Sequence, residues 1–324
     1  MEKTLAIIGA GAWGSAIAIT LSDKFDKIFL ITKDQTNTDN LGNQHKALSK
    51  SFNSIISIGS SFNVIEESQA VLIATPSSSF NNVLKNLKPY IENKPVAWLT
   101  KGFDPDNGKL LHESFSLLLP NHHPCVISGP TFAAEIVEKK PAAIVVASHD
   151  KATRDFWAET IQTSNLRAYT NSDIVGVQVG GSVKNILAIA AGISSELGFG
   201  ANTQAALITR GLAEMTRLGE ALGADKATFQ GLSGIGDLVL TCSDDLSRNR
   251  RFGKELANNI PSDKALKNIN ATVEGFKALK LVIMIANNHQ VEMPICQQVL
   301  AVTEGRISPR DAVTELLLRK PSQE

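Results

Sequence analysis

Short apolar runs rich in β-branched residues alternate with helical stretches in the first half of the chain. The runs are a few residues long and bounded by turn residues, which suits buried strands. The predicted strands span residues 4–8, 27–31, 70–74, 96–99, 125–127 and 142–147. Alternation of this kind is typical of an α/β fold, in which helices cover both faces of a sheet. The pattern therefore predicts an N-terminal, doubly wound, mainly parallel sheet.

From about Asp173 onward the pattern changes, because apolar residues recur at helical spacing and strand-like runs become scarce. The clearest helical segments are residues 203–222, 274–286 and 309–318. The last segment has a start signal, since Ser308 can cap a helix and Pro309 suits its first position. We therefore expect two domains, the sheet over residues 1–178 and an all-helical domain over residues 179–324.

Composition and charge limit the class of protein. The 324 residues include 32 Lys plus Arg and 32 Asp plus Glu, so no overall field attracts nucleic acid or an acidic membrane. Uninterrupted apolar runs fall short of the roughly 18 residues of a membrane span. Cys125, Cys242 and Cys296 form no C-x-x-C pair, and the six histidines show no metal-like pair. We expect a soluble protein of a reducing cytoplasm that binds neither nucleic acid, membrane nor metal.

A glycine-rich turn follows the first predicted strand. The stretch LAIIGAGAWGSAIAITL places Gly9, Gly11 and Gly14 in G-x-G-x-x-G spacing at the start of an apolar helix. Such glycines permit a tight turn, the close approach of a pyrophosphate and close packing of helix on strand. Helix amide groups and the helix dipole would hold the phosphates. The spacing alone is weak evidence, but its position between strand and helix predicts a Rossmann-type dinucleotide site.

The end of the second predicted strand bears on the coenzyme. Sheets that prefer NAD carry an acidic residue there, which bonds the ribose 2′-hydroxyl. In this chain Thr32 and Lys33 stand at the tip, and Asp34 follows. Lys33 could meet the 2′-phosphate of NADPH, or it could be a solvated loop lysine. We expect NAD(H) or NADP(H) as the cofactor, with NADPH slightly favoured.

Four predicted strands change abruptly at their carboxyl ends from apolar residues to Gly, Pro, Ser, Thr or Lys. These ends read IIGAG, LIATPS, WLTKG and VISGPTFA. Open parallel sheets bind ligands at this edge, so Lys101, Gly129 and Thr131 could hold a small oxygen-rich substrate. Taken singly, each of these residues is more often part of a turn than a ligand contact.

One charged residue stands out in the helical half. Lys184 is the only charged side chain between Asp173 and Glu196, and it lies in the apolar stretch QVGGSVKNILAIAAG. If it is buried, its partner is distant in sequence or is a ligand. Apolar surroundings disfavour the charged ammonium, which suits a group that gives and takes a proton. The alternative is a stem on apolar surface with its head in water.

A polar cluster follows in GLSGIGDLVLTCSDDLSRNRRFG, which also contains the isolated Asp237. Arginine presents a planar fork of donors that suits phosphate oxygens, so we expect at least one arginine here to bind an anion. The alternative is a solvated helix start paired with neighbouring acidic residues. The cluster consists of Ser247, Arg248, Asn249, Arg250 and Arg251.

These stretches, with TKG, ALITRGLAEM and VEG, occur in order over nearly the whole chain and resemble the bacterial NAD(P)-dependent sn-glycerol-3-phosphate dehydrogenases. The resemblance implies an oxidoreductase that transfers hydride reversibly between NAD(P)H and dihydroxyacetone phosphate. The product is sn-glycerol 3-phosphate, used in phospholipid synthesis. Residues 1–178 would then be a dinucleotide-binding domain and residues 179–324 a helical substrate domain. The apolar faces of the helical half could support a homodimer.

The resemblance also implies the site residues, with Lys184 as the catalytic acid/base. Asp237 would orient Lys184 or bond a substrate hydroxyl, and Asn185 would hold a neighbouring oxygen. The implied substrate-binding residues are Lys101, Gly129, Thr131, Lys184, Asp237, Ser247, Arg248 and Asn249. The implied cofactor-binding residues are Gly9, Gly11, Ala12, Trp13, Gly14, Lys33, Lys101, Ala133, Arg248 and Glu274. The loop over residues 34–54 departs from the family pattern.

Two other functions fit parts of the pattern. A β-hydroxyacid dehydrogenase of similar two-domain design also employs a lysine on the inter-domain helix, but it would act on unphosphorylated keto acids. A dinucleotide-sensing regulatory module would bind the cofactor without turnover. That second alternative leaves Lys184, Asp237 and the arginine cluster unexplained.

Overall fold

The structure, a computed structural model, describes residues 2–318. The chain forms two compact units, Met1–Gln178 and Val179–Glu324. We call them the sheet unit and the helical unit. Helix α7 (Ile174–Glu196) begins in the first and continues into the second.

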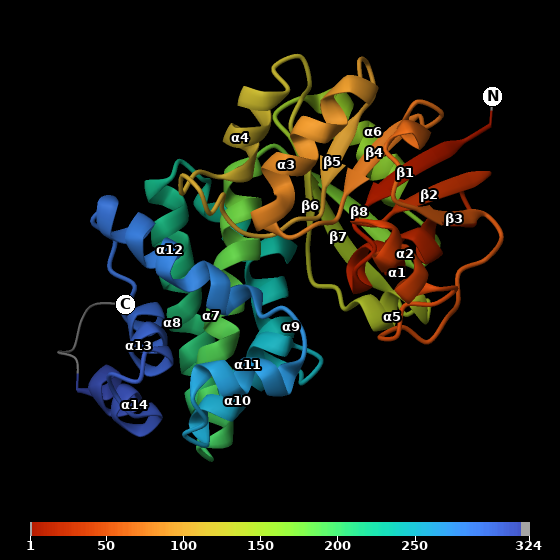
Figure 1. Cartoon of the computed structure of the whole chain (residues 1–324). Helices are drawn as coiled ribbons and strands as arrows, with labels where there is room; N and C mark the ends of the chain where they lie inside the picture. Colours follow the sequence, from red (N-terminus) through yellow and green to blue (C-terminus); the bar gives the residue numbers. More distant parts are fainter. Residues whose placement is uncertain (1, 319–324) are drawn as a thin grey trace. The chain divides into compact units, whose positions relative to one another are not determined.

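The described part of the sheet unit contains an eight-stranded sheet of order β3-β2-β1-β4-β5-β6-β7-β8 (Figure 1). Neighbouring strands are parallel except for β6 and β7, which are antiparallel. The prediction of a mainly parallel, doubly wound sheet is confirmed. The strands are β1 (Thr4–Ile8), β2 (Lys27–Ile31), β3 (Ile56–Gly59), β4 (Ala70–Ile73), β5 (Val96–Trp98), β6 (Val126–Ser128), β7 (Ala142–Ala147) and β8 (Leu166–Asn171).

Helices cover both faces of this sheet because its central strands are apolar on both sides. On one face, Ile17 of α1, Ile136 of α5 and Trp157 of α6 join the strand core. On the other, Trp98 packs against Phe80 of α3 and Phe115 of α4, with ring centroids 5.4 and 5.2 Å away. The helical elements are α1 (Ala12–Leu21), α2 (Gln35–Leu41), η1 (Asn63–Ile65), α3 (Ser77–Leu87), η2 (Lys88–Tyr90), α4 (Leu111–Leu118), α5 (Ala133–Val137) and α6 (Lys151–Ile161).

The sequence pattern missed β3 and β8, which are the two outermost strands of the sheet. An edge strand has a partner on one side only, so it need not be apolar throughout. Accordingly β8 alternates and exposes Tyr169, and β3 has only four residues and ends at Gly59. The strand predicted over residues 125–127 is wrong by one position, since β6 spans Val126–Ser128.

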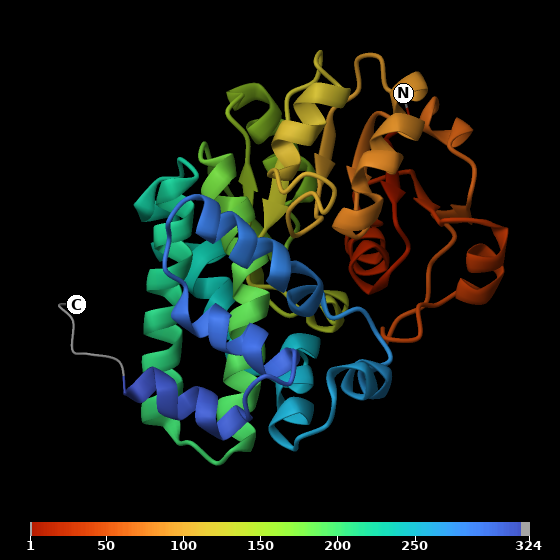
Figure 2. The ribbon, with the colours of Figure 1, turned by 60° about the vertical axis from the view of Figure 1, so that its left-hand side comes forward.

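The regular elements in the described part of the helical unit are all helical, which confirms the predicted all-helical domain (Figure 2). Ser308 caps the last helix by accepting a hydrogen bond from the Asp311 amide at 3.1 Å, as predicted. The elements after α7 are α8 (Ala201–Ala221), η3 (Lys226–Gln230), η4 (Leu232–Gly236), α9 (Asp237–Ser243), α10 (Arg248–Ala257), α11 (Ser262–Ile269), α12 (Glu274–Asn288), α13 (Pro294–Thr303) and α14 (Pro309–Leu317).

Helix α7 forms the core of the helical unit. It is long and apolar enough to span a membrane, but 94% of its most apolar window is buried inside the structure, as in the core helix of a folded domain. A Cβ atom on Gly192 would lie 2.0 Å from the Arg250 carbonyl oxygen, and one on Gly253 would lie 2.1 Å from that of Ile189. Helices α7 and α10 therefore pack in backbone contact, which holds the first turn of α10 beside α7.

Candidate active site

Lys184 lies on α7 and is 5% exposed. Its Nζ forms an ion pair with a carboxylate oxygen of the fully buried Asp237 and donates to Oγ1 of Thr241 at 3.0 Å. The partner is 53 residues away, so the prediction of a distant partner is confirmed and the alternative of a solvated head is wrong. Burying two charges costs desolvation, and removal of one partner leaves the other charge uncompensated. Loss of either partner alone is therefore expected to lower the free energy of unfolding.

Thr241 is a member of this cluster that the sequence analysis missed. Asp237 is the first residue of α9, and Thr241 lies one helical turn later on the same face. The Thr241 hydroxyl donates to the Asp237 backbone carbonyl at 2.6 Å. Its oxygen is thereby directed as an acceptor toward Lys184 Nζ. The i, i+4 spacing from Asp237 is the signal that could have identified it.

A chain of side-chain amides begins one residue further along α7, at Asn185. Asn249 Nδ2 donates to Asn185 Oδ1 at 2.9 Å, and Asn185 Nδ2 donates to a Glu274 carboxylate oxygen at 3.2 Å. The Gly275 amide donates to Asn249 Oδ1 at 2.8 Å. Helices α7, α10 and α12 are thus joined by polar contacts, and Asn185 brings the predicted residues Asn249 and Glu274 together.

The predicted arginine cluster divides into residues with different surroundings. Ser247 caps α10 by accepting from the Arg250 amide at 3.2 Å. The buried guanidinium of Arg250 pairs with Asp245 and donates to the Cys242 carbonyl at 2.9 Å, so the alternative of pairing with a neighbouring acid holds for this arginine. The half-buried guanidinium of Arg248 has no hydrogen bond or ion pair within residues 2–318. The exposed Arg251 likewise has no side-chain hydrogen bond or ion pair within these residues, so Arg248 and Arg251 are the two arginines of the cluster that are not engaged by the described part of the chain.

The cysteines contribute no nucleophile to this site. Cys125, Cys242 and Cys296 are buried free thiols. Burial raises the pKa of each, and that of Cys242 to about 12. A thiol with such a pKa stays protonated near neutral pH and is a weak nucleophile. The chemistry near Lys184 consequently rests on nitrogen and oxygen groups.

The glycine loop in the sheet unit has two kinds of glycine. Gly9 has a φ of +112°, and a Cβ there would lie 2.7 Å from the Ala74 carbonyl oxygen. A Cβ on Gly14 would lie 1.9 Å from the Gly9 carbonyl oxygen. Nothing described lies within 4 Å of the corresponding position on Gly11, which precedes α1 as its N-cap. The fold requires Gly9 and Gly14, whereas Gly11 leaves open space beside a helix N-terminus.

The start of α1 fits a dinucleotide pyrophosphate. Its first turn contains Ala12 and Trp13, carries no acidic residue, and receives no side-chain cap from Gly11. The first amide groups of a helix have no partner within the helix, and its dipole favours an anion there. These groups together with the space at Gly11 could hold the phosphates.

The side chains of Lys33 and Asp34 have different surroundings. Lys33 is exposed at the tip of β2. Asp34 caps α2, accepting from the Asn37 amide at 2.9 Å and from Asn37 Nδ2 at 2.7 Å. These hydrogen bonds lower the pKa of Asp34. The carboxylate is thus engaged in a cap at the start of the 34–54 segment.

The other predicted residues of the sheet unit follow neighbouring strands. Strands β1, β4, β5 and β6 are adjacent and parallel, so their carboxyl ends lie at one edge. Gly9, Lys101 and Gly129 come from this edge, and Lys101 is half-buried. Thr131 follows Gly129, to whose carbonyl it donates at 3.3 Å, and Ala133 begins α5.

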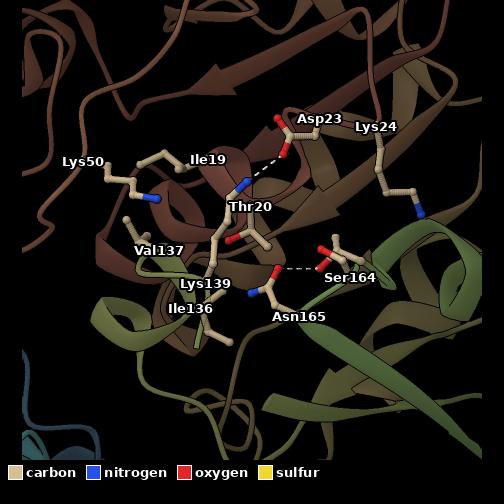
Figure 3. Close-up of a pocket in the computed structure, with 11 residues that line it drawn as sticks. Ile19, Thr20, Asp23, Lys24, Lys50, Ile136, Val137, Lys139, Ser164 and Asn165 are labelled. Atoms are coloured by element: carbon tan, nitrogen blue, oxygen red, sulfur yellow. Dashed lines mark hydrogen bonds and ion pairs between the residues drawn. The ribbon is translucent and has the colours of Figure 1, made fainter. Parts of the chain in front are cut away.

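A pocket of about 130 Å³ lies elsewhere in the sheet unit. Figure 3 shows residues that line it. None of the predicted site residues is among the described residues that line it. Lys139 there pairs with Asp23 at 3.0 Å, and Lys24 donates to three backbone carbonyls near the end of α6. The described lining shares no residue with the site around Lys184, so this pocket lies outside the candidate active site.

Two family models together match most of the chain. The N-terminal model of NAD-dependent glycerol-3-phosphate dehydrogenase matches residues 4–154, and the C-terminal model matches residues 173–314. A protein of Ruthia magnifica subsp. Calyptogena magnifica, named glycerol-3-phosphate dehydrogenase (NAD(P)+), is 56% identical over 325 residues and 100% of both chains. A protein of the same name from Hydrogenovibrio crunogenus is 43% identical over 98% of this chain and 95% of its own.

Solved structures show the same similarity. Glycerol-3-phosphate dehydrogenase from Coxiella burnetii aligns with a TM-score of 0.94 and 38% identity, covering 98% of this chain and 99% of its own. The Plasmodium falciparum enzyme of that name aligns with a TM-score of 0.86 over 99% of this chain and 97% of its own. Its identity is 18%, so it shows a shared fold alone.

Proposed function

Because this chain belongs to the NAD-dependent glycerol-3-phosphate dehydrogenase family, we propose that it reduces dihydroxyacetone phosphate reversibly to sn-glycerol 3-phosphate with NAD(P)H. The product would serve phospholipid synthesis. The observation that carries the proposal is the buried Lys184, which Asp237 and Thr241 hold in place. A module that only senses dinucleotides does not need a buried, oriented proton donor.

Lys184 is the proposed acid/base. Reduction of a ketone delivers hydride to carbon and requires a proton at the oxygen as negative charge develops there. A nicotinamide bound to the sheet unit would supply the hydride. Lys184 Nζ would stabilise the developing charge and then donate the proton, and it would accept the proton in the reverse direction. Asp237 and Thr241 orient Nζ, which keeps the ammonium group from turning away from the substrate oxygen.

Arg248 is the proposed phosphate ligand. Its guanidinium is not engaged by any described residue, and it lies in the first turn of α10, where the helix dipole favours an anion. Ser247 and Asn249 would donate further hydrogen bonds. A firm hold on the phosphate fixes the reacting carbon, so this contact should support turnover as well as affinity. Lys101, Gly129 and Thr131 are the proposed substrate residues of the sheet unit.

The sheet unit, residues 1–178, is proposed to bind the dinucleotide, and residues 179–324 to form the substrate domain. The open position at Gly11 and the uncapped start of α1 support this assignment. NADPH is slightly favoured over NADH, because Lys33 is exposed while Asp34 is engaged as a cap. The proposed cofactor residues are Gly9, Gly11, Ala12, Trp13, Gly14, Lys33, Lys101, Ala133, Arg248 and Glu274.

Steady-state oxidation of NADH and of NADPH with dihydroxyacetone phosphate tests the function and the coenzyme choice together. We expect turnover with both coenzymes, a higher kcat/KM with NADPH, and none with unphosphorylated keto acids. Turnover of keto acids alone would support the β-hydroxyacid alternative. Tight coenzyme binding with no oxidation by any ketone would support the sensing module.

A homodimer is part of the proposal. The helical unit has a groove of about 1190 Å³ with walls from α7, α8, α13 and α14, among them Leu207, Val299 and Leu316. The partly exposed Leu207 and Leu316 of this groove could pack against a second copy of the chain. Sedimentation analysis should give twice the chain mass, and Leu207→Glu should give the monomer. A monomeric unmodified protein would refute the proposed homodimer.

The free thiols are consistent with the proposed location in a reducing cytoplasm.

A further inference from the structure

Asp104 is a buried carboxylate outside the site described so far. It lies between β5 and α4 and is 1% exposed. A buried carboxylate is costly unless donors satisfy it. Its oxygens accept from Ser114 Oγ at 2.6 Å, from Asn81 Nδ2 and Asn107 Nδ2 at 2.8 Å each, and from the Asp106 amide at 3.0 Å. The carboxylate is therefore well satisfied.

These donors come from separate parts of the sheet unit. Asn81 belongs to α3, Ser114 belongs to α4, and Asn107 belongs to the loop itself. The Asp104 backbone also pairs with the loop, donating to the Lys109 carbonyl and accepting from the Gly108 amide, both at 2.9 Å. One residue thus closes the loop over residues 101–110 and ties it to two helices.

The ionisation of Asp104 matches this role. Burial alone would raise its pKa, but the hydrogen bonds from Ser114, Asn81, Asp106 and Asn107 outweigh that effect and lower the pKa. The group is then an ionised carboxylate near neutral pH, which accepts hydrogen bonds and donates none. An amide of the same shape could not accept from all of these donors.

Lys101 lies in this loop between two fixed points. Just before it, Thr100 Oγ1 donates to the Thr75 carbonyl at 2.7 Å. Just after it, Gly102 has a φ of +113°, and a Cβ there would lie 3.2 Å from Ser77 Oγ at the start of α3. The buried carboxylate two residues further on completes the fixation. The Lys101 backbone is consequently held from both sides.

We propose that Asp104 is a positioning residue, whose carboxylate holds the loop so that Lys101 is preordered for its anionic ligand. The inference rests on the proposed function, in which Lys101 binds substrate and cofactor. A loosened loop would have to be ordered during binding, and the entropic cost of that ordering would lower kcat/KM.

A double-mutant cycle tests the role. Asp104→Asn keeps the shape and removes acceptor capacity, and we expect kcat/KM for dihydroxyacetone phosphate to fall about tenfold or more. In a Lys101→Met background the same change should have little further effect, because the residue that it positions is already lost. The matched control is Asp106→Asn, an exposed neighbour whose carboxylate makes no hydrogen bond or ion pair within residues 2–318. This control should retain the kcat/KM of the unmodified enzyme.

Hydrogen exchange gives a readout that is independent of turnover. Asp104→Asn should speed exchange in residues 101–110, and Asp106→Asn should not. If Asp104→Asn does not fold, Ser114→Ala removes one donor and should change both measurements in the same direction by less. If Asp104→Asn changes neither hydrogen exchange nor kcat/KM, the positioning role is refuted. It is also refuted if Asp104→Asn lowers kcat/KM equally with Lys101 and with Met at position 101. If Lys101→Met alone has no effect, the assigned role of Lys101 fails, and the inference fails with it.

Discussion

The two units hold their candidate residues in opposite ways. In the sheet unit these residues lie in loops and first helical turns that follow the ends of parallel strands. In the helical unit Lys184, Asp237 and Asn249 are buried side chains that are held by hydrogen bonds from neighbouring helices. A common cofactor can be held largely by backbone geometry, whereas a particular reaction depends on a few oriented side chains.

The largest effect expected from this comparison is at Lys184. Lys184→Met should lower kcat by about 1000-fold, since it removes the proposed proton donor. It should leave NADPH affinity within about twofold, because the proposed cofactor contacts lie elsewhere. Stopped-flow oxidation and fluorescence titration measure the two quantities. Substantial remaining turnover would exclude Lys184 as the donor, and a matching loss of NADPH binding would contradict the division of roles.

Substitutions at two glycines of the sheet unit should affect different properties, Gly14→Ala the stability of the fold and Gly11→Ala the binding of the coenzyme. Gly14→Ala puts a Cβ 1.9 Å from the Gly9 carbonyl oxygen, so the free energy of unfolding should fall by about 3 kcal/mol. Gly11→Ala meets no described atom within 4 Å, so it should cost less than about 1 kcal/mol. It should nevertheless weaken NADPH binding more than about tenfold by blocking the pyrophosphate. Urea unfolding measures the stability of both variants, and coenzyme titration measures their affinity for NADPH. Equal destabilisation by the two substitutions would refute the prediction.

The smallest effect expected is a pH dependence at His112. Its ring Nδ1 lies 3.0 Å from Gln178 Nε2, and its amide donates to Gln178 Oε1 at 3.1 Å. Burial lowers the pKa of His112 below its ordinary value of 6.5. The unfolded chain therefore binds the proton more readily, so the stabilising contribution is complete above pH 6.5 and declines as the pH falls through the folded pKa.

Urea unfolding at several pH values measures this decline. His112→Asn should flatten the pH dependence below pH 6.5. The exposed His289 of the helical unit is the control, and His289→Asn should behave like the unmodified protein. The same slope in all three proteins would show that His112 does not report on the stability of the sheet unit.

Local patterns in the sequence determined the α/β sheet, the helical second half and the glycine loop. Apolar periodicity and glycine spacing reflect contacts made within one element or between consecutive ones, so they can be recognised without a structure. The isolation of Lys184 among apolar residues likewise predicted a distant partner. It did not identify that partner, because nothing in a local stretch specifies which remote segment packs against it.

Tertiary structure alone decided the rest. It brought Asp237 and Thr241 to Lys184 across more than 50 residues, and it separated Arg250, which pairs with Asp245, from the unengaged Arg248. It also showed that β3 and β8 are strands, because an edge strand is defined by its neighbour in the sheet and not by a continuous apolar run. The amino-acid sequence thus determines which side chains each helix or strand buries. The packing of these elements determines which polar side chains come into contact.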